Sequence, residues 1–96
     1  MKMLQIICDS GFESYLLENL EKNGINNFTK IEKVLGKGKS SEPHMDDEVW
    51  PGYHVLYYIK LEDKDYERIK PILFQMKEKL KGKGFKVFVY EIFEEI

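Results

Sequence analysis

The sequence has a single cysteine and no apolar run long enough to cross a lipid bilayer. Cys8 alone cannot form a disulfide bond within the chain. The longest apolar runs, such as residues 55–59, are far shorter than the about 20 residues that a transmembrane helix needs. The first residues include neither an apolar segment of the right length nor the cleavage site of a secretory signal. We therefore expect a cytoplasmic protein that is not inserted into a membrane.

The chain also lacks a strong excess of charge of one sign. Its 15 basic and 17 acidic residues leave a formal net charge of −2. Binding to nucleic acid depends on many contacts between basic side chains and phosphates, so we expect no nucleic-acid partner. At 43% apolar and 33% charged residues, the composition is typical of a soluble folded protein, and we expect one domain over residues 1–96.

Spacings typical of catalytic sites, such as G-x-S-x-G and C-x-x-C, are absent from the sequence. A nucleophile needs an oriented base beside it. The neighbour of Cys8 in the sequence is Asp9, and no catalytic motif places a base next to this thiol. We interpret Cys8 as a small buried apolar group and expect no enzymatic activity. The alternative, a small hydrolase or transferase, requires a catalytic pair around Cys8.

Four segments have the apolar, β-branched or aromatic composition of strands. They cover residues 3–8, 28–35, 54–61 and 85–92. Side chains of residues 55, 57, 59 and 61 are expected on one side of the third strand, and those of residues 54, 56, 58 and 60 on the other.

Two helices are expected between these strands. Ser10 and Glu13 form an S-x-x-E capping box before the first helix, which Gly24 ends in a left-handed conformation. Asp63 or Asp65 is expected to cap the second helix, which Gly82 ends. Pro71 predicts a kink or a late start in this helix, because proline removes a hydrogen bond from a helix interior.

The order β-α-β-β-α-β predicts an α+β, ferredoxin-like fold. It comprises a four-stranded antiparallel sheet with two helices on one face, which leaves the other face open. Aromatic residues are expected on both sides of the strands, at Tyr57, Tyr58, Phe88 and Tyr90. Because an uncovered aromatic face would be a large exposed apolar patch, we expect self-association through it.

Residues 36–52 form a long polar insert between the second and third strands. Long inserts in small domains are usually functional or disordered. The insert begins with Gly36, Lys37, Gly38 and Lys39, where backbone N–H groups and two ammonium groups could hold an anion. A second basic glycine stretch, residues 81–86, enters the fourth strand and ends at Lys86. Trp50 either anchors the insert on the sheet, stacks on a ligand base or packs on a neighbouring subunit.

The tip of the insert could instead bind a metal ion. His44 precedes Asp46, Asp47 and Glu48, and a mixed histidine and carboxylate site could hold zinc, nickel or cobalt. His54 is interpreted as a packed or edge histidine of its strand. The alternative function is therefore a divalent-metal-binding module that resembles the trimeric cation tolerance proteins.

The whole pattern resembles the PII-like signalling proteins, which are trimeric ferredoxin-like domains. Residues 28–39 resemble the family's second strand and the start of its T-loop, and residues 86–89 resemble the start of its fourth strand. The stretches 36–44 and 50–52 resemble a divergent branch, some of whose members occur near efflux systems.

The resemblance implies a homotrimeric, non-enzymatic regulator that binds adenine nucleotides in clefts between subunits. Gly36, Lys37, Gly38 and Lys39 would lie on one side of such a cleft, and Lys86 on the other. It further implies that the 36–52 loop contacts a partner such as a membrane transporter or an efflux system. The identity of the ligand and of the partner is left open by the sequence.

Overall fold

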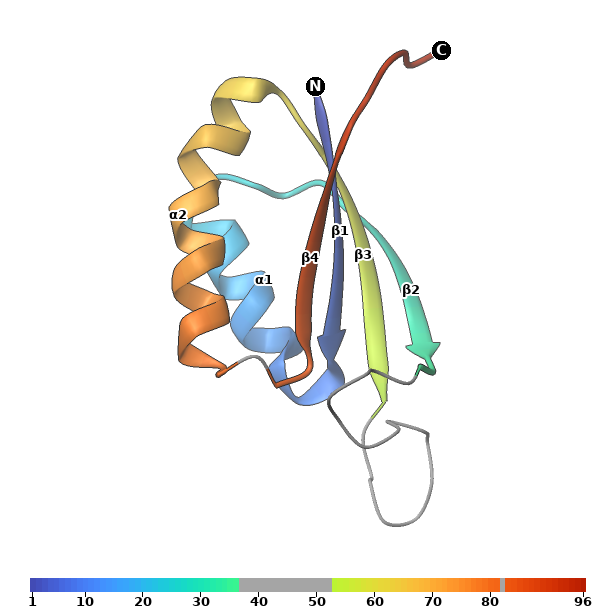
Figure 1. The fold of residues 1–96 in the computed structure, drawn as a ribbon, viewed down its shortest axis with the longest axis vertical. Helices are drawn as coiled ribbons and strands as arrows, with labels where there is room; N and C mark the ends of the chain where they lie inside the picture. The colour runs from blue at the N-terminus through green and yellow to red at the C-terminus, as the bar shows by residue number, and fades with distance from the viewer. Residues whose placement is uncertain (37–52, 82) are drawn as a thin grey trace.

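The strands pair into one antiparallel sheet with two helices packed against one of its faces (Figure 1). The computed structural model describes residues 1–36, 53–81 and 83–96. The elements are β1 (Lys2–Asp9), a 3-10 turn (Ser10–Phe12), α1 (Glu13–Lys22), β2 (Thr29–Val34), β3 (His54–Leu61), α2 (Asp63–Lys79) and β4 (Phe85–Glu91). The α+β, ferredoxin-like fold class predicted from the sequence is therefore confirmed.

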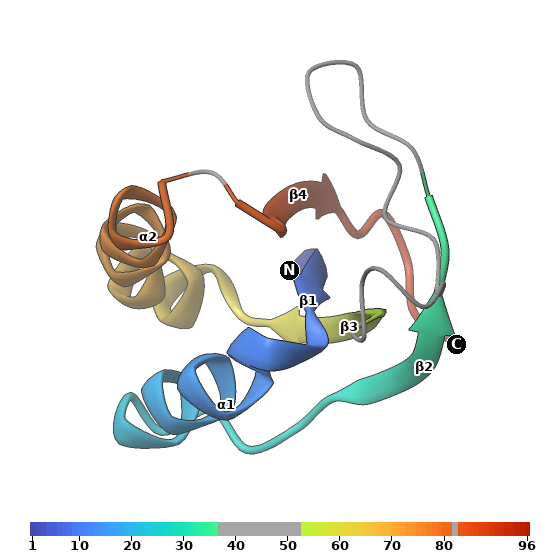
Figure 2. The same ribbon diagram turned by 90° about the horizontal axis from the view of Figure 1, so that it is seen from below.

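The strands lie in the order β2-β3-β1-β4, so β1 and β3 are central and β2 and β4 form the two edges. Both helices lie on the same side of the sheet in Figures 1 and 2. Alternate residues of β1 and β3 face the helices and are buried, because side chains in a strand point to opposite faces in turn. This core includes Leu4, Ile6, Tyr57 and Ile59, packed with helix residues such as Leu16 and Ile69.

The other face of the sheet has no helix over it in the described part of the chain. Its central row follows from the strand register, in which Gln5 pairs with Tyr58 on one side and with Phe88 on the other. The neighbouring rows place Met3 beside Tyr90, and Ile7 beside Leu56. The predicted open aromatic face is thus present at Tyr58, Phe88 and Tyr90, whereas the ring of Tyr57 is buried on the helix side.

The predicted capping box at the start of α1 is wrong. The chain first forms a 3-10 turn, whose N-cap is Asp9, and the Asp9 carboxylate accepts a hydrogen bond of 2.8 Å from the Gly11 N–H. Phe12 is the N-cap of α1 and makes no capping hydrogen bond through its side chain. Glu13 contacts β2 and β3 instead, so its carboxylate is used in tertiary structure.

The predicted end of α1 at Gly24 is confirmed, and it has the geometry of a Schellman motif. Gly24 has φ +77°, and its N–H donates to the Glu21 carbonyl at 3.0 Å. The Ile25 N–H donates to the Leu20 carbonyl at 2.9 Å, and both of these side chains are buried. Hydrogen bonds and an apolar contact of this kind stabilise a helix end whose carbonyls have no partner within the helix.

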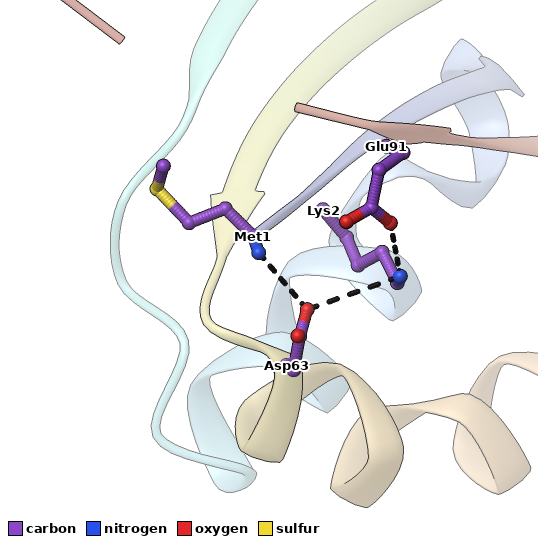
Figure 3. Close-up of polar contacts among 4 residues, drawn as sticks. All are labelled: Met1, Lys2, Asp63 and Glu91. Atoms are coloured by element: carbon purple, nitrogen blue, oxygen red, sulfur yellow. Dashed lines mark hydrogen bonds and ion pairs between the residues drawn. The ribbon is translucent and has the colours of Figure 1, made fainter. Parts of the chain in front are cut away.

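The start of α2 also differs from the predicted cap. Its N-cap is Glu62, which makes no capping hydrogen bond through its side chain. The Asp63 carboxylate accepts a hydrogen bond of 3.0 Å from the amino group of Met1 and lies 3.9 Å from the ammonium of Lys2, which also pairs with Glu91 (Figure 3). The hydrogen bond from Met1 lowers the pKa of Asp63, and the hydrogen bond to Glu91 raises the pKa of Lys2. These contacts join the start of α2 to β1 and β4.

The helix α2 contains Pro71 and begins at Asp63, so the late start predicted as one effect of this proline is wrong. Lys79 is the last helical residue, and Lys81, with φ +53°, is the left-handed residue after it. The sequence assigned the helix stop to Gly82, which lies outside the described residues. The left-handed conformation is therefore taken by a lysine, a residue type that usually avoids it.

Candidate functional site

The segments that the sequence predicts to bind a ligand lie at one end of the sheet, on different strands. Because neighbouring strands are antiparallel, β1 and β2 end here and β3 and β4 begin here (Figure 1). Gly36, the first residue of the insert, follows β2, and Tyr53 directly precedes β3, so both lie at this end. The turn into β4 lies here as well.

Backbone hydrogen bonds hold these segments together. The Asp9 N–H donates to the Gly84 carbonyl, and the Ser10 N–H donates to the Tyr53 carbonyl, both at 2.7 Å. Gly84 has φ +55°, and a Cβ atom added there would lie 2.8 Å from the Cβ of Asp9. The turn into β4 thus approaches the end of β1 so closely that only glycine fits without displacement.

Gly36 and Lys86 are the two predicted ligand-binding residues that the structure describes, and one chain does not bring them together. Gly36 follows the edge strand β2, whereas Lys86 lies on the opposite edge strand β4. Strands β3 and β1 lie between them, a separation of three strand spacings or roughly 14 Å. Lys86 is exposed, and its ammonium makes no hydrogen bond or ion pair with the described part of the chain.

The other predicted binding residues lie outside the described residues. They are Lys37, Gly38, Lys39 and Trp50 of the ligand-binding prediction, and His44, Asp46 and Asp47 of the metal prediction. Among residues 1–36, 53–81 and 83–96, no three histidine, cysteine, aspartate or glutamate side chains are grouped in a way that could hold a metal ion.

Cys8 is the central residue of the enzymatic alternative, and its side chain is completely buried. Its thiol donates a hydrogen bond of 3.2 Å to the carbonyl oxygen of Asp9. Burial, with a smaller contribution from the Asp9 carboxylate, raises the pKa of this thiol to about 12. The reactive thiolate is therefore scarce at neutral pH. His54 is also buried and sits opposite Asp9 in the register of β1 and β3, as expected for a packed strand histidine.

A polar cluster that the sequence analysis missed joins α1 to β2 and β3. The Tyr57 hydroxyl donates a hydrogen bond to the Glu13 carboxylate, and the Lys30 ammonium pairs with the same carboxylate. Lys30 also lies 3.2 Å from Glu32. The residues are far apart in the sequence, and none belongs to a short motif.

The charges within this cluster shift the pKa values of its members. Partial burial acts to raise the pKa of Glu13, but the hydrogen bonds from Lys30 and Tyr57 outweigh burial and lower it. Burial and the Glu13 carboxylate raise the pKa of Tyr57, and the hydrogen bond to Glu13 raises that of Lys30. The ion pair of Lys30 with Glu13 and the hydrogen bond from Tyr57 link α1 to β2 and β3.

A groove of about 440 Å³ lies between α2 and β4, and we call it the α2–β4 groove. Its walls are mainly apolar and its rim is basic. The walls include Leu73 and Phe74 of α2 and residues 87–89 of β4, and the lysines around it are Lys70, Lys77 and Lys86. This groove was not predicted from the sequence, although Phe74 is a large apolar residue outside the buried stripe of α2. In the structure Phe74 is 66% exposed.

In the described part of the chain, no helix is both long enough and apolar enough to span a membrane.

Comparison with known protein families gives one match. The family model of the nitrogen regulatory protein P-II matches residues 1–95 of this chain. No match was found among curated proteins.

Solved structures with the same fold include PII-like proteins of two bacteria. CPII of Thiomonas intermedia K12, a nitrogen regulatory PII-like protein bound to ADP, AMP and bicarbonate, is 18% identical with a TM-score of 0.69, over 95% of this chain and 88% of that chain. Its apo form is 19% identical with a TM-score of 0.71, over 95% and 87% of the two chains. A PII-like signalling protein of Thermus thermophilus is 19% identical with a TM-score of 0.57, over 93% and 80%.

Proposed function

Because the chain belongs to the nitrogen regulatory protein P-II family, we propose that it is a non-enzymatic signalling protein that binds a small anionic ligand in clefts between its own copies. The first ligand to consider is an adenine nucleotide. The assembly is a homotrimer, and residues 36–52 form the loop that contacts a partner.

The position of the two basic glycine stretches is the observation that supports this proposal. Gly36 and Lys86 lie on opposite edges of the sheet, so two chains that meet edge to edge would place the two stretches on either side of one ligand. The ammonium of Lys86 is exposed and makes no ion pair with the described residues, so it is available to a phosphate group. Lys37 and Lys39 would supply further positive charge from the other chain.

The open face of the sheet supports the assembly. Apolar and aromatic side chains cover its rows, among them Ile7, Leu56, Tyr58, Phe88 and Tyr90. An apolar surface of this kind on one chain is stabilised when a second copy covers it. Packing of three such faces around a common axis would bury them and bring the edge of one sheet next to that of another.

The choice of nucleotide follows from CPII, whose structure contains ADP, AMP and bicarbonate. The TM-score of 0.69 shows a common fold, but at 18% identity it does not extend to the ligand, so the ligand is the part of the proposal to test first. The proposed partner is a membrane transporter or an efflux system, which the 36–52 loop would contact from the cytoplasmic side. A change in that loop on ligand binding would connect the ligand to the partner.

The first test is of assembly and ligand binding together. Light scattering is expected to give the mass of a trimer, and Tyr58→Glu is expected to give monomers because it buries a charge in the proposed interface. Calorimetric titration with ADP and with AMP is expected to show binding to the wild-type trimer. Heat from bicarbonate alone would identify the ligand as a small anion rather than a nucleotide.

Lys86→Gln tests the cleft directly. Loss of a charged hydrogen-bonding partner is expected to weaken ADP binding about ten-fold or more. Lys64→Gln is the matched control, because Lys64 is an exposed lysine of α2 outside the proposed cleft. A monomeric wild-type protein, or equal ADP affinity in the Lys86→Gln and Lys64→Gln proteins, would overturn the proposal.

A further inference from the structure

The α2–β4 groove and the segment after β4 have complementary chemistry. The groove combines apolar walls with a rim of lysines, and the strand β4 that borders it is an edge of the sheet. One edge of β4 pairs with β1, and no strand lies beside the other edge in the described part of the chain. An edge strand next to an apolar groove is a surface on which an extended peptide can dock.

The composition of the segment Ile92–Ile96 is complementary to that of the groove. Phe93 is 99% exposed, and Ile96 is fully exposed, so two large apolar side chains have no packing partner within the described chain. Glu94 and Glu95 lie between them in the sequence. The segment therefore pairs apolar anchors with negative charge, opposite to the lysines around the groove.

Within its own chain, the segment Ile92–Ile96 is directed away from the α2–β4 groove. The Ile92 N–H donates to the Met1 carbonyl at 3.0 Å, and Glu95 accepts a hydrogen bond of 2.9 Å from Lys60 of β3. Since β1 separates β3 from β4, these contacts lead the chain across the sheet and away from the outer edge of β4. In both ribbon views, the C-terminus lies on the β2 side of the molecule and α2 lies on the opposite side (Figures 1 and 2).

We propose that Ile92–Ile96 of one copy docks in the α2–β4 groove of a second copy. Phe93 fills the apolar part of the groove against Leu73 and Phe74, and Glu94 faces Lys70 at the rim. The docked segment contributes an aromatic ring that is exposed in the single chain. The groove contributes an apolar wall with a lysine beside it. The groove shares Lys86 with the proposed nucleotide cleft and Phe88 with the open face of the sheet. The docking contacts named here, at Leu73, Phe74 and Lys70, belong to neither.

Aromatic anchors in the centre of an interface usually contribute most of its binding energy, whereas charges at the rim select the partner and its orientation. Phe93 is accordingly the anchor, and the pair formed by Glu94 and Lys70 sets the direction. Lys70 is available for this pair, because its ammonium lies 5.8 Å from the ring centre of Tyr66 and forms no ion pair within the described chain. It also lies outside the proposed nucleotide cleft.

The test is cross-linking between two differently substituted full-length chains. One chain carries Val89→Cys in the groove, and the other carries Ile96→Cys, so a mixed product can form only between copies. Native Cys8 is buried, so it is not expected to react under mild conditions. The control replaces the groove variant by Glu18→Cys, an exposed position on α1. A short bis-maleimide and mass spectrometry are expected to give more mixed product for the groove pair than for the control pair.

Charge reversal then tests the orientation. Lys70→Glu in the groove chain is expected to lower the yield of mixed product about five-fold, and Glu94→Lys in the other chain is expected to restore it. Phe93→Ser is expected to lower the yield at least as much. A yield equal to that of the Glu18→Cys control would overturn the proposal, as would a Lys70→Glu variant with unchanged yield.

A doubly substituted chain, with Val89→Cys and Ile96→Cys together, tests whether the segment folds onto its own groove. Cross-linking within this chain in preference to the mixed product would also overturn docking between copies. ADP titration of the Phe93→Ser protein separates this proposal from the nucleotide proposal. If the protein cross-links but does not bind ADP, the docking proposal stands and the nucleotide proposal fails. If it binds ADP but does not cross-link, the nucleotide proposal stands and the docking proposal fails.

Discussion

The Tyr57 hydroxyl donates a hydrogen bond to the Glu13 carboxylate, and this contact joins the middle of β3 to the first turn of α1. The Tyr57 ring is completely buried and makes an edge-to-face contact with Phe28, with ring centres 5.2 Å apart. Lys30 neutralises Glu13 from the neighbouring strand. The buried Tyr57 ring thus packs in the core while its hydroxyl is hydrogen-bonded to a carboxylate of α1.

Tyr57→Phe is expected to lower the free energy of unfolding by about 1–2 kcal/mol, because it removes a hydrogen bond to a charged group but keeps the ring. Urea denaturation at fixed protein concentration measures the loss. Tyr53→Phe is the control, since the Tyr53 hydroxyl makes no hydrogen bond within the described chain. Equal effects of the two substitutions would contradict the role given to the Tyr57 hydroxyl.

The lowered pKa of Glu13 predicts a contribution to stability that depends on pH. A carboxyl group with a folded-state pKa below its ordinary value of 4.5 stabilises the fold fully above pH 4.5. This contribution is lost as the pH falls through the folded-state pKa, because the proton then prevents the ion pair with Lys30. Glu13→Gln is therefore expected to be less stable than the wild type at pH 7, with a difference that shrinks on acidification. Unfolding curves at pH 7, 5 and 3 check this, and a difference independent of pH would argue against it.

Lys81→Gly is expected to stabilise the protein by about 1 kcal/mol. Lys81 has φ +53°, a left-handed conformation that is strained for a residue with a Cβ atom. Lys81→Ala removes the same charge and its exposed 3.9 Å ion pair with Glu78 but keeps the strain, so it should give no gain. Thermal unfolding of both variants separates the backbone effect from the charge, and a gain in Lys81→Ala would show that charge is the cause.

Gly84→Ala is expected to cost more stability than Gly24→Ala. Both glycines have positive φ, so each substitution loses about 1 kcal/mol through backbone conformation. At Gly24, the nearest atom to an added Cβ is a flexible Arg68 nitrogen at 3.7 Å, whereas at Gly84 it is the Cβ of Asp9 at 2.8 Å. The extra clash would displace the turn into β4 from the end of β1. Denaturation of the two variants under the same conditions gives the comparison, which fails if their losses are equal.

The sequence predicted the element order because the core is built from regular alternation. In β3, every second residue from Val55 to Leu61 is buried, and the predicted range 54–61 agrees with the observed strand. The end of α1 was predictable for a similar reason, since a left-handed helix end strongly favours glycine. These signals are local, so they can be recognised without knowing which segments pack against each other.

Contacts between distant segments were not predictable in this way. The S-x-x-E pattern at Ser10 suggested a cap, but Glu13 binds Tyr57 and Lys30 instead, which only the packing of α1 on the sheet decides. The carboxylate of Asp63 likewise binds Met1 rather than capping α2. The α2–β4 groove arises from two elements that are each ordinary in sequence. In the candidate ligand site, local composition was enough to select Gly36 and Lys86. Their positions on opposite edges of the sheet are known only from the strand order.

The strand order has a thermodynamic consequence for any ligand that needs both Gly36 and Lys86. In the proposed cleft the two edges β2 and β4 would come from different chains, so ligand affinity and subunit association would be linked equilibria. Dilution of the protein would weaken the apparent affinity, and saturating ligand would lower the concentration at which the chains dissociate. The abundance of the protein in the cell would then set its response as much as the abundance of the ligand.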